Sequence, residues 1–269
     1  MKKSIKIAII ALLLGSIVAC SKDDTEDKKI VVGASTTPHA LILEAARPAI
    51  ESQGYTLEIV EFTDYVLPNT ALDVGDLDAN YFQHVPYLNK FNAERNTKLA
   101  SVLAIHFEPL GLYPGRSTSV SAITAGGVTI AIPNDPTNET RALRLLEDNG
   151  YISFGDDGTK DVTPINITEN PYNITFVEME AALLPQTLVD VDFAVINGNY
   201  ALGANIQGSV LLTEDKDSHA ANTFANVLVV QIGKENSEKT QVLISALSST
   251  AIKQYIENTF YPTVISVLP

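Results

Sequence analysis

Hydrophobic and polar positions alternate between strand-like and helix-like spacing along the first part of the chain. Short apolar or alternating runs predict strands at residues 29–34, 55–62 and 99–107. Apolar residues at helical spacing, with turn residues between them, predict helices at 41–50, 65–74 and 86–96. This β-α-β-α-β order favours a mostly parallel sheet with helices packed on its faces.

A second run of the same kind follows. Strands are expected at 127–133, 192–196 and 226–232, and helices at 136–148, 236–247 and 249–258. Residues 155–175 are rich in Gly, Asp, Asn and Thr, which indicates loops with short strands. We therefore predict an α/β protein of two lobes with a ligand cleft between them. Lobe I takes residues 30–108 plus 226–269, and lobe II takes residues 109–225.

The N-terminal residues have the pattern of a bacterial export signal that ends at a cysteine. Lys2, Lys3 and Lys6 precede an apolar stretch too short to span a bilayer, and Cys20 is the chain's only cysteine. This arrangement resembles the lipobox, which implies cleavage after residue 19 and a lipid on Cys20. The alternative, a buried cysteine, conflicts with the charged run over 22–29, which indicates a flexible leash over 20–29.

The chain is acidic, with a formal net charge of −14. Loss of the three signal-peptide lysines would take this charge to −17 (−14 minus 3). Nucleic acid is therefore not an expected partner, and broad contact with anionic lipid is not expected either. Without a second cysteine there can be no disulfide within the chain, so its stability must come from an apolar core.

Aromatic residues gather at the expected strand ends of lobe I. Tyr65 follows the second strand, and Phe82, His84 and Tyr87 follow the next turn, with Tyr81 beside them. An aromatic wall suits an apolar or thioether side chain, because sulfur and ring atoms attract one another. The alternative is that these rings are ordinary core residues.

Three polar side chains are candidates for binding a charged ligand. Arg141 lies in the first turns of the helix that Asp135 and Pro136 begin, and its planar guanidinium matches a carboxylate. Asn197 and Asn226 follow or enter apolar strands, where an amide can accept from an ammonium group or donate to a carboxylate. The alternatives are a solvated arginine on a helix face and amides satisfied by nearby backbone.

Sequence motifs for catalysis are missing. The chain has no Gly-x-Ser-x-Gly elbow, no His-Glu-x-x-His helix and no glycine-rich phosphate loop, and its histidines lie apart at 39, 84, 106 and 219. We therefore expect neither an enzyme nor a bound cofactor or metal.

Four segments resemble the NlpA/MetQ lipoprotein family, the substrate-binding proteins of methionine-type ABC importers. They are residues 61–69, 78–84, 132–138 and 194–197. The resemblance implies a two-lobed, hinge-closing fold like the type II periplasmic binding proteins. It also implies a methionine-like ligand, which includes D-methionine and a methionine dipeptide, and an ABC permease with its ATPase as partners. The family's binding residues match Tyr65, Phe82, His84, Tyr87, Arg141, Asn197 and Asn226.

Other functions remain open at this point. A metal-binding receptor on the same scaffold would use His39, His84 and His106 as ligands. A surface adhesin would need no cleft, and a hydrolase would need a nucleophile and a base. The chain departs from the family around 35–38, after Gly115 and over 217–224, and the last of these segments lies near the expected hinge.

Overall fold

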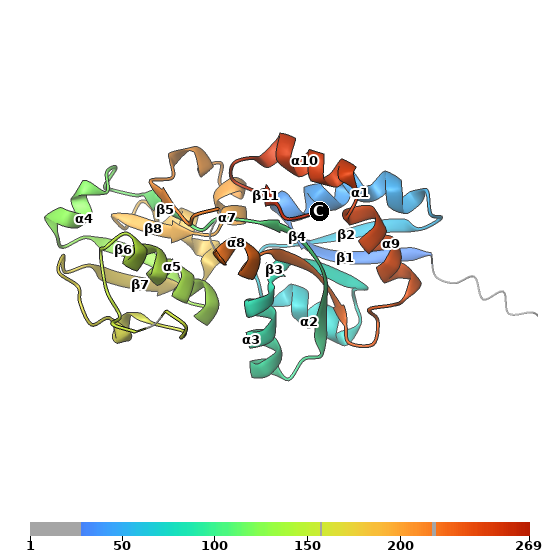
Figure 1. The fold of residues 1–269 in the computed structure, drawn as a ribbon, viewed down its shortest axis with the longest axis horizontal. Coiled ribbons are helices and arrows are strands. Elements are labelled where there is room, and N and C mark those ends of the chain that lie inside the picture. Colours follow the sequence, from blue (N-terminus) through green and yellow to red (C-terminus); the bar gives the residue numbers. More distant parts are fainter. Residues whose placement is uncertain (1–27, 157, 217–218) are drawn as a thin grey trace, which may run out of the picture.

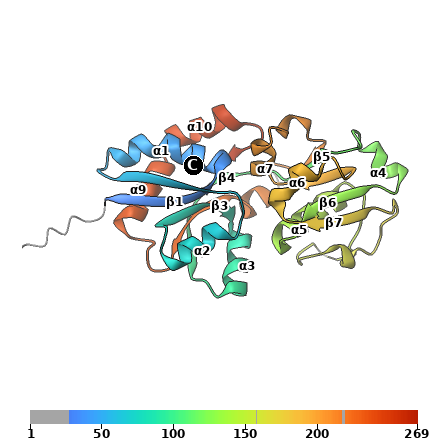
Figure 2. The same cartoon turned by 180° about the vertical axis from the view of Figure 1, so that it is seen from behind.

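Two β-sheets, each with its own helices, lie side by side in the protein (Figures 1 and 2). The computed structural model describes residues 28–156, 158–216 and 219–269. The expected signal peptide, Cys20 and most of the leash therefore lie outside the described residues. We call the part of the chain around the first sheet lobe I and the part around the second sheet lobe II.

The lobe I sheet has six strands in the order β11-β4-β10-β3-β1-β2. Its strands are β1 (Lys29–Ser35), β2 (Thr56–Phe62), β3 (Ala79–His84), β4 (Leu99–Phe107), β10 (Asn226–Gln231) and β11 (Ile265–Ser266). β1 is parallel to β2, as the β-α-β order predicts, and also to β3, a strand that the hydrophobic pattern did not predict. β10 returns from lobe II and pairs antiparallel with both β3 and β4.

Helices cover both faces of this sheet (Figures 1 and 2). One face carries α1 (Leu41–Glu51), α9 (Glu238–Leu247) and α10 (Thr250–Phe260), and the other carries α2 (Leu67–Val74) and α3 (Val85–Arg95). Each layer buries its own apolar cluster against the strands. The turn η1 (Thr36–Ala40) joins β1 to α1.

The lobe II sheet has five strands in the order β7-β6-β8-β5-β9. They are β5 (Gly111–Pro114), β6 (Thr129–Pro133), β7 (Thr175–Met179), β8 (Phe193–Ile196) and β9 (Leu212–Thr213). α5 (Pro136–Asp148) packs its apolar side on one face, and α7 (Gly198–Gly203) and α6 (Leu184–Thr187) cover the other. The remaining elements are α4 (Ser121–Ala125), α8 (His219–Thr223), η2 (Pro164–Asn166), η3 (Ala181–Leu183) and η4 (Gln207–Ser209).

α5 begins and ends where the sequence predicts. The Asp135 side chain accepts a hydrogen bond of 3.0 Å from the Asn138 backbone N–H, and Pro136 fills the first helical position. An aspartate cap and a proline at this position both favour a helix start. The capped turn fixes the direction in which the helix leaves β6 and so places Arg141.

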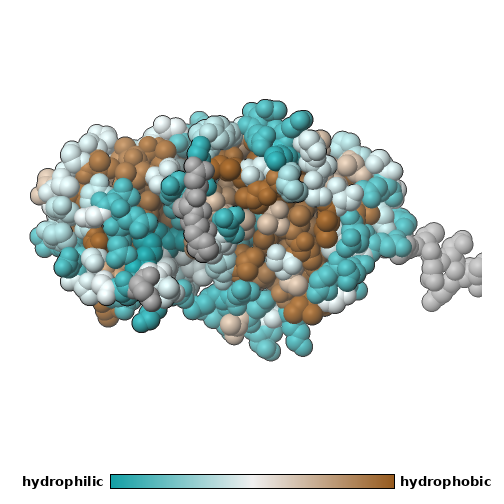
Figure 3. Space-filling model, viewed as in Figure 1, coloured by the Kyte–Doolittle hydropathy of each residue, from teal (hydrophilic) through white to brown (hydrophobic). Residues whose placement is uncertain are grey.

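The chain passes between the lobes at Glu108 to Leu110, after β4, and again between β9 and β10. Figure 3 shows hydrophilic residues over much of lobe II and the outer end of lobe I, with a hydrophobic area over the middle of lobe I. Within the described ranges, no helix combines the length and the apolar character that a membrane span requires.

Candidate binding site

A cavity lies between the two lobes. Its wall contains all of the predicted binding residues together with residues that were not predicted. The lining consists of Tyr65, Phe82, Gln83, His84, Tyr87, Glu108, Asn138, Arg141, Asn197, Gly198, Asn199 and Asn226.

Lobe I supplies the aromatic side of the cavity. The Tyr65 ring centroid lies 5.9 Å from the Phe82 centroid and 5.9 Å from that of Tyr87. The Tyr87 hydroxyl donates to the Tyr65 carbonyl at 2.8 Å, and the Tyr65 hydroxyl donates across the cleft to Asn199 Oδ1 at 2.6 Å. These bonds hold the rings in place and leave their faces to form an apolar wall.

His84 is the last residue of β3 and is buried in the cavity wall. Its Nδ1 accepts a 3.1 Å hydrogen bond from the Tyr87 backbone N–H, so the proton of the neutral ring is on Nε2. Nε2 lies 3.3 Å from Asn138 Oδ1 in lobe II. Burial, and after it the charge of Arg141, lowers the His84 pKa to about 3, which keeps the ring neutral.

Arg141 is buried, not solvated on a helix face. Its Nε and Nη2 atoms donate to the two carboxylate oxygens of Glu214 at 3.0 and 2.6 Å. Nη2 also donates to the Glu108 carbonyl at 3.1 Å, and Nη1 donates to Asn138 Oδ1 at 3.2 Å. Glu214 thus holds one edge of the guanidinium from outside the cavity, while Arg141 itself lines the cavity.

The two predicted asparagines, Asn197 and Asn226, differ in their hydrogen bonds. Asn197 Nδ2 donates to Asn138 Oδ1 at 2.9 Å, while its Oδ1 is buried without a hydrogen-bond partner among the described residues. Asn226 Oδ1 instead lies 2.9 Å from His39 Nε2. Buried polar atoms nearly always have partners, so the Asn197 oxygen marks the place of a missing donor.

The structure adds Glu108 and Asn138 to the predicted set. Asn138 Oδ1 receives donors from both lobes, and its Nδ2 group contacts both carboxylate oxygens of Asp135. The sequence signal for Asn138 was its place in the turn that caps α5. The signal for Glu108 was a single carboxylate directly before Pro109, where the chain was expected to cross between lobes.

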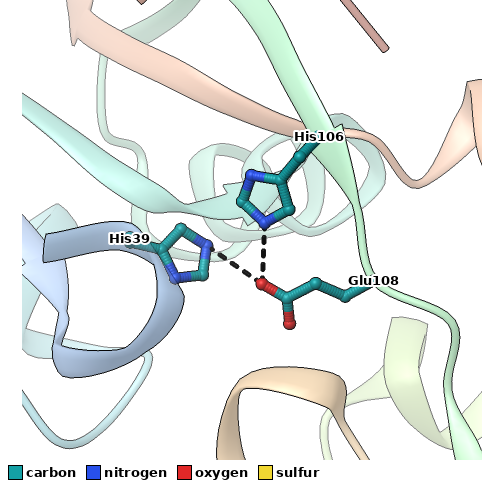
Figure 4. A group of neighbouring side chains, drawn as sticks. All are labelled: His39, His106 and Glu108. Atoms are coloured by element: carbon teal, nitrogen blue, oxygen red, sulfur yellow. Dashed lines mark hydrogen bonds and ion pairs between the residues drawn. The ribbon is translucent and has the colours of Figure 1, made fainter. Parts of the chain in front are cut away.

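Glu108 also joins two histidines in a buried group, shown in Figure 4. Its Oε1 lies 2.7 Å from His106 Nε2 and 3.5 Å from His39 Nε2. Potential metal-ligand atoms of these three residues lie within 4.8 Å of one another. The metal-receptor alternative named His84 as the third ligand, but His84 instead faces Asn138.

A two-lobed α/β fold with a cavity between its lobes that is lined by aromatic, amide and charged side chains defines the class of periplasmic-type solute-binding proteins. The profile of the family described as NlpA lipoprotein matches residues 30–268. The chain therefore belongs to the NlpA lipoprotein family.

Several known proteins are similar to this chain over most of its length. It is 41% identical over 256 residues to the membrane lipoprotein TpN32 of Treponema pallidum, covering 94% of this chain and 92% of that protein. It is 34% identical to the methionine-binding lipoprotein MetQ of Bacillus subtilis, covering 99% of each. A nutrient-binding protein of Burkholderia cenocepacia, solved bound to methionine, aligns with a TM-score of 0.82 and 36% identity, over 88% of this chain and 99% of that one.

Proposed function

We propose that this protein binds L-methionine or a close relative, such as D-methionine or a methionine dipeptide, in the interlobe cavity. The observation that carries the proposal is the meeting of three chemistries in one cavity: aromatic faces, a buried arginine and an amide oxygen without a partner. Relatives at 34–36% identity are named for methionine or were solved with it, which supports the same ligand.

The ligand's side chain would pack against Tyr65, Phe82 and Tyr87. Contacts between a thioether and aromatic rings contribute about 0.3–1.5 kcal/mol each. This apolar wall lies on lobe I, so a side chain can dock there before the lobes close.

The ligand carboxylate would bind Arg141 through Nη1, the nitrogen that faces away from the Glu214 pair. Among the described residues, Nη1 has Asn138 as its hydrogen-bond partner, whereas Nε and Nη2 are bound to Glu214. The ammonium group would donate to Asn197 Oδ1, which has room for a donor. The Asn226 oxygen is occupied by His39, so we assign its NH₂ group to a ligand oxygen.

We further propose that the protein hands its ligand to an ABC permease with an associated ATPase, and that a lipid on Cys20 holds it outside the cytoplasmic membrane. The leash between Cys20 and the first strand has about nine residues and reaches at most ~30 Å when extended. Such a tether would raise the concentration of the binder at the permease.

The first test is to identify the ligand that the protein carries. We expect mass spectrometry of protein purified from its host under mild conditions to find methionine or a methionine-containing compound. Calorimetry with L-methionine, D-methionine and glycyl-methionine would then rank these ligands on the same preparation. A protein that binds none of them would overturn the proposal.

A further inference from the structure

The carboxylate of Glu108 is buried in the cavity wall, and no cation of the described residues contacts it. Arg141 reaches the backbone carbonyl of Glu108, while its ion pair is with Glu214. The groups closest to the carboxylate are His39 and His106, and burial lowers their pKa values to about 4 and about 3. Both rings are therefore neutral, and burial without a countercharge raises the pKa of the Glu108 carboxyl.

Two N–H groups hold this carboxylate in a fixed position, and a third lies nearby. The Asn199 backbone N–H donates to Oε2 at 2.7 Å, and His106 Nε2 donates to Oε1 at 2.7 Å. The Tyr81 hydroxyl contacts His106 Nδ1, which fixes the proton of that ring on Nε2. His39 Nε2 lies 3.5 Å from the same Oε1. The carboxylate accepts from both lobes, so its direction is set on either side of the cleft.

The backbone around Gly198 leaves room for this arrangement. A Cβ atom at Gly198 would lie 2.9 Å from Glu108 Cβ and 3.1 Å from Oε2. A side chain there would push the carboxylate away from the Asn199 N–H. Gly198 thus permits the close approach of lobe II to Glu108 at the cavity wall.

The neighbouring amides show which charge this part of the cavity lacks. Asn197 Oδ1, in the same wall, is an acceptor without a donor among the described residues. His39 Nε2 donates to Asn226 Oδ1, which turns the Asn226 oxygen away from any ligand. A buried carboxylate without a countercharge and an amide oxygen without a donor together suit a cationic donor, and an ammonium group offers three N–H bonds.

We propose that Glu108 binds the ammonium group of the ligand, that His39 and His106 are positioning residues for it, and that the cavity thereby selects free α-amino acids. The inference rests on the proposed function and makes it more specific. A ligand whose amino group is acylated or absent would leave Glu108 buried without a cationic partner, and buried unpaired charges are costly.

The test compares methionine with desamino-methionine, which has hydrogen in place of the amino group, and with N-acetyl-methionine. We expect the native protein to bind methionine roughly a hundredfold more tightly than either analogue. Glu108→Gln should lower methionine affinity roughly ten- to a hundredfold and leave desamino-methionine affinity unchanged, so that the preference collapses. Glu108→Asp keeps the charge and should restore part of the preference.

Glu214→Gln is the matched control, because Glu214 is a carboxylate on the other side of Arg141. It should weaken methionine and desamino-methionine by the same factor, since both carry the carboxylate that Arg141 binds. His39→Gln should reduce the preference between these ligands by less than Glu108→Gln does, because it leaves the charge in place.

The outcomes separate the two proposals. A native protein that binds methionine and desamino-methionine equally well would overturn the role of Glu108 without the need for a variant. A Glu108→Gln protein that keeps the native preference would overturn it too, and both results would leave methionine binding intact. If the native protein bound neither ligand, the proposed function itself would fail.

Discussion

The two sides of the cavity hold their shape by different means. The lobe I wall is aromatic, and its rings are fixed by packing and by a few backbone hydrogen bonds. The lobe II wall is polar, and Arg141, Asn138 and Asn197 are tied to one another through side-chain hydrogen bonds. An apolar wall discriminates weakly between side chains, whereas a buried polar wall strongly rejects ligands that leave its groups unpaired. Arg141 and Asn197 of lobe II, together with Glu108 at the crossing between the lobes, should therefore set which head group binds, and the aromatic rings of lobe I should set which side chain binds.

The largest effect is expected from Arg141→Ala. The substitution removes the partner of the ligand carboxylate and leaves the half-buried Glu214 without its cation, which costs up to about 3 kcal/mol of folding stability. Methionine affinity should fall by at least the ~1.5–3 kcal/mol of a charged hydrogen bond. Urea unfolding and calorimetry measure the two losses separately.

A double variant separates stability from binding. Arg141→Met combined with Glu214→Gln removes both charges, so folding stability should return close to the native value while binding stays lost. Recovery of methionine binding in this double variant would show that the arginine does not hold the carboxylate.

The second prediction concerns the pH dependence of stability, to which lobe I contributes three buried histidines. The pKa values of His39, His84 and His106 are lowered by burial to about 4, about 3 and about 3. As the pH falls below 6.5, these histidines become protonated in the unfolded chain but stay neutral in the folded protein. The free energy of unfolding therefore decreases between pH 6.5 and pH 4. Denaturant unfolding should show a loss of at least about 2 kcal/mol between pH 7 and pH 5.

His84→Gln tests the assignment of that slope. The stability of the variant should decrease less steeply below pH 6.5, because it has one fewer histidine that is protonated only in the unfolded chain. An unchanged slope would mean that His84 titrates normally in the folded protein.

The third prediction is a smaller effect on the aromatic wall. Phe82→Leu keeps an apolar side chain but removes one ring, so methionine affinity should fall by about 1 kcal/mol. The preference for methionine over desamino-methionine should not change, because Phe82 contacts the side chain and not the head group. A change in that preference would contradict the idea that the aromatic rings select the ligand side chain and the polar residues select its head group.

Local sequence patterns predicted the elements better than the contacts between them. The capping residues Asp135 and Pro136 predicted α5, and apolar periodicity predicted strands and helices of lobe I. The antiparallel direction of β10 could not be predicted from the sequence, because a buried apolar run looks the same in a parallel and an antiparallel strand. The short strands β5 and β9 of lobe II carry too few residues for a periodic signal.

The candidate site shows the same limit. Resemblance and residue chemistry predicted its lining, but Glu214 and Glu108 enter through pairings between distant segments. The register of the sheet aligns Asn226 with His84 on one neighbouring strand and with His106 on the other, and local patterns do not contain this register. The unpaired Asn197 oxygen is likewise a property of the folded protein.

The smallest effect on binding is expected from Cys20→Ala. Cys20 lies outside the described residues and far along the chain from the cavity lining, so calorimetry should give an unchanged methionine affinity. Fractionation of cells should find the variant released from the membrane. A Cys20→Ala protein that stays with the membrane would contradict the proposed lipid anchor.

The most direct test of the account is a crystal structure of the protein with methionine. We predict the thioether against the rings of Tyr65 and Phe82, the carboxylate within hydrogen-bond distance of Arg141 Nη1, and the ammonium group between Asn197 Oδ1 and Glu108. A methionine bound outside the interlobe cavity, or one whose carboxylate lies away from Arg141, would contradict the account.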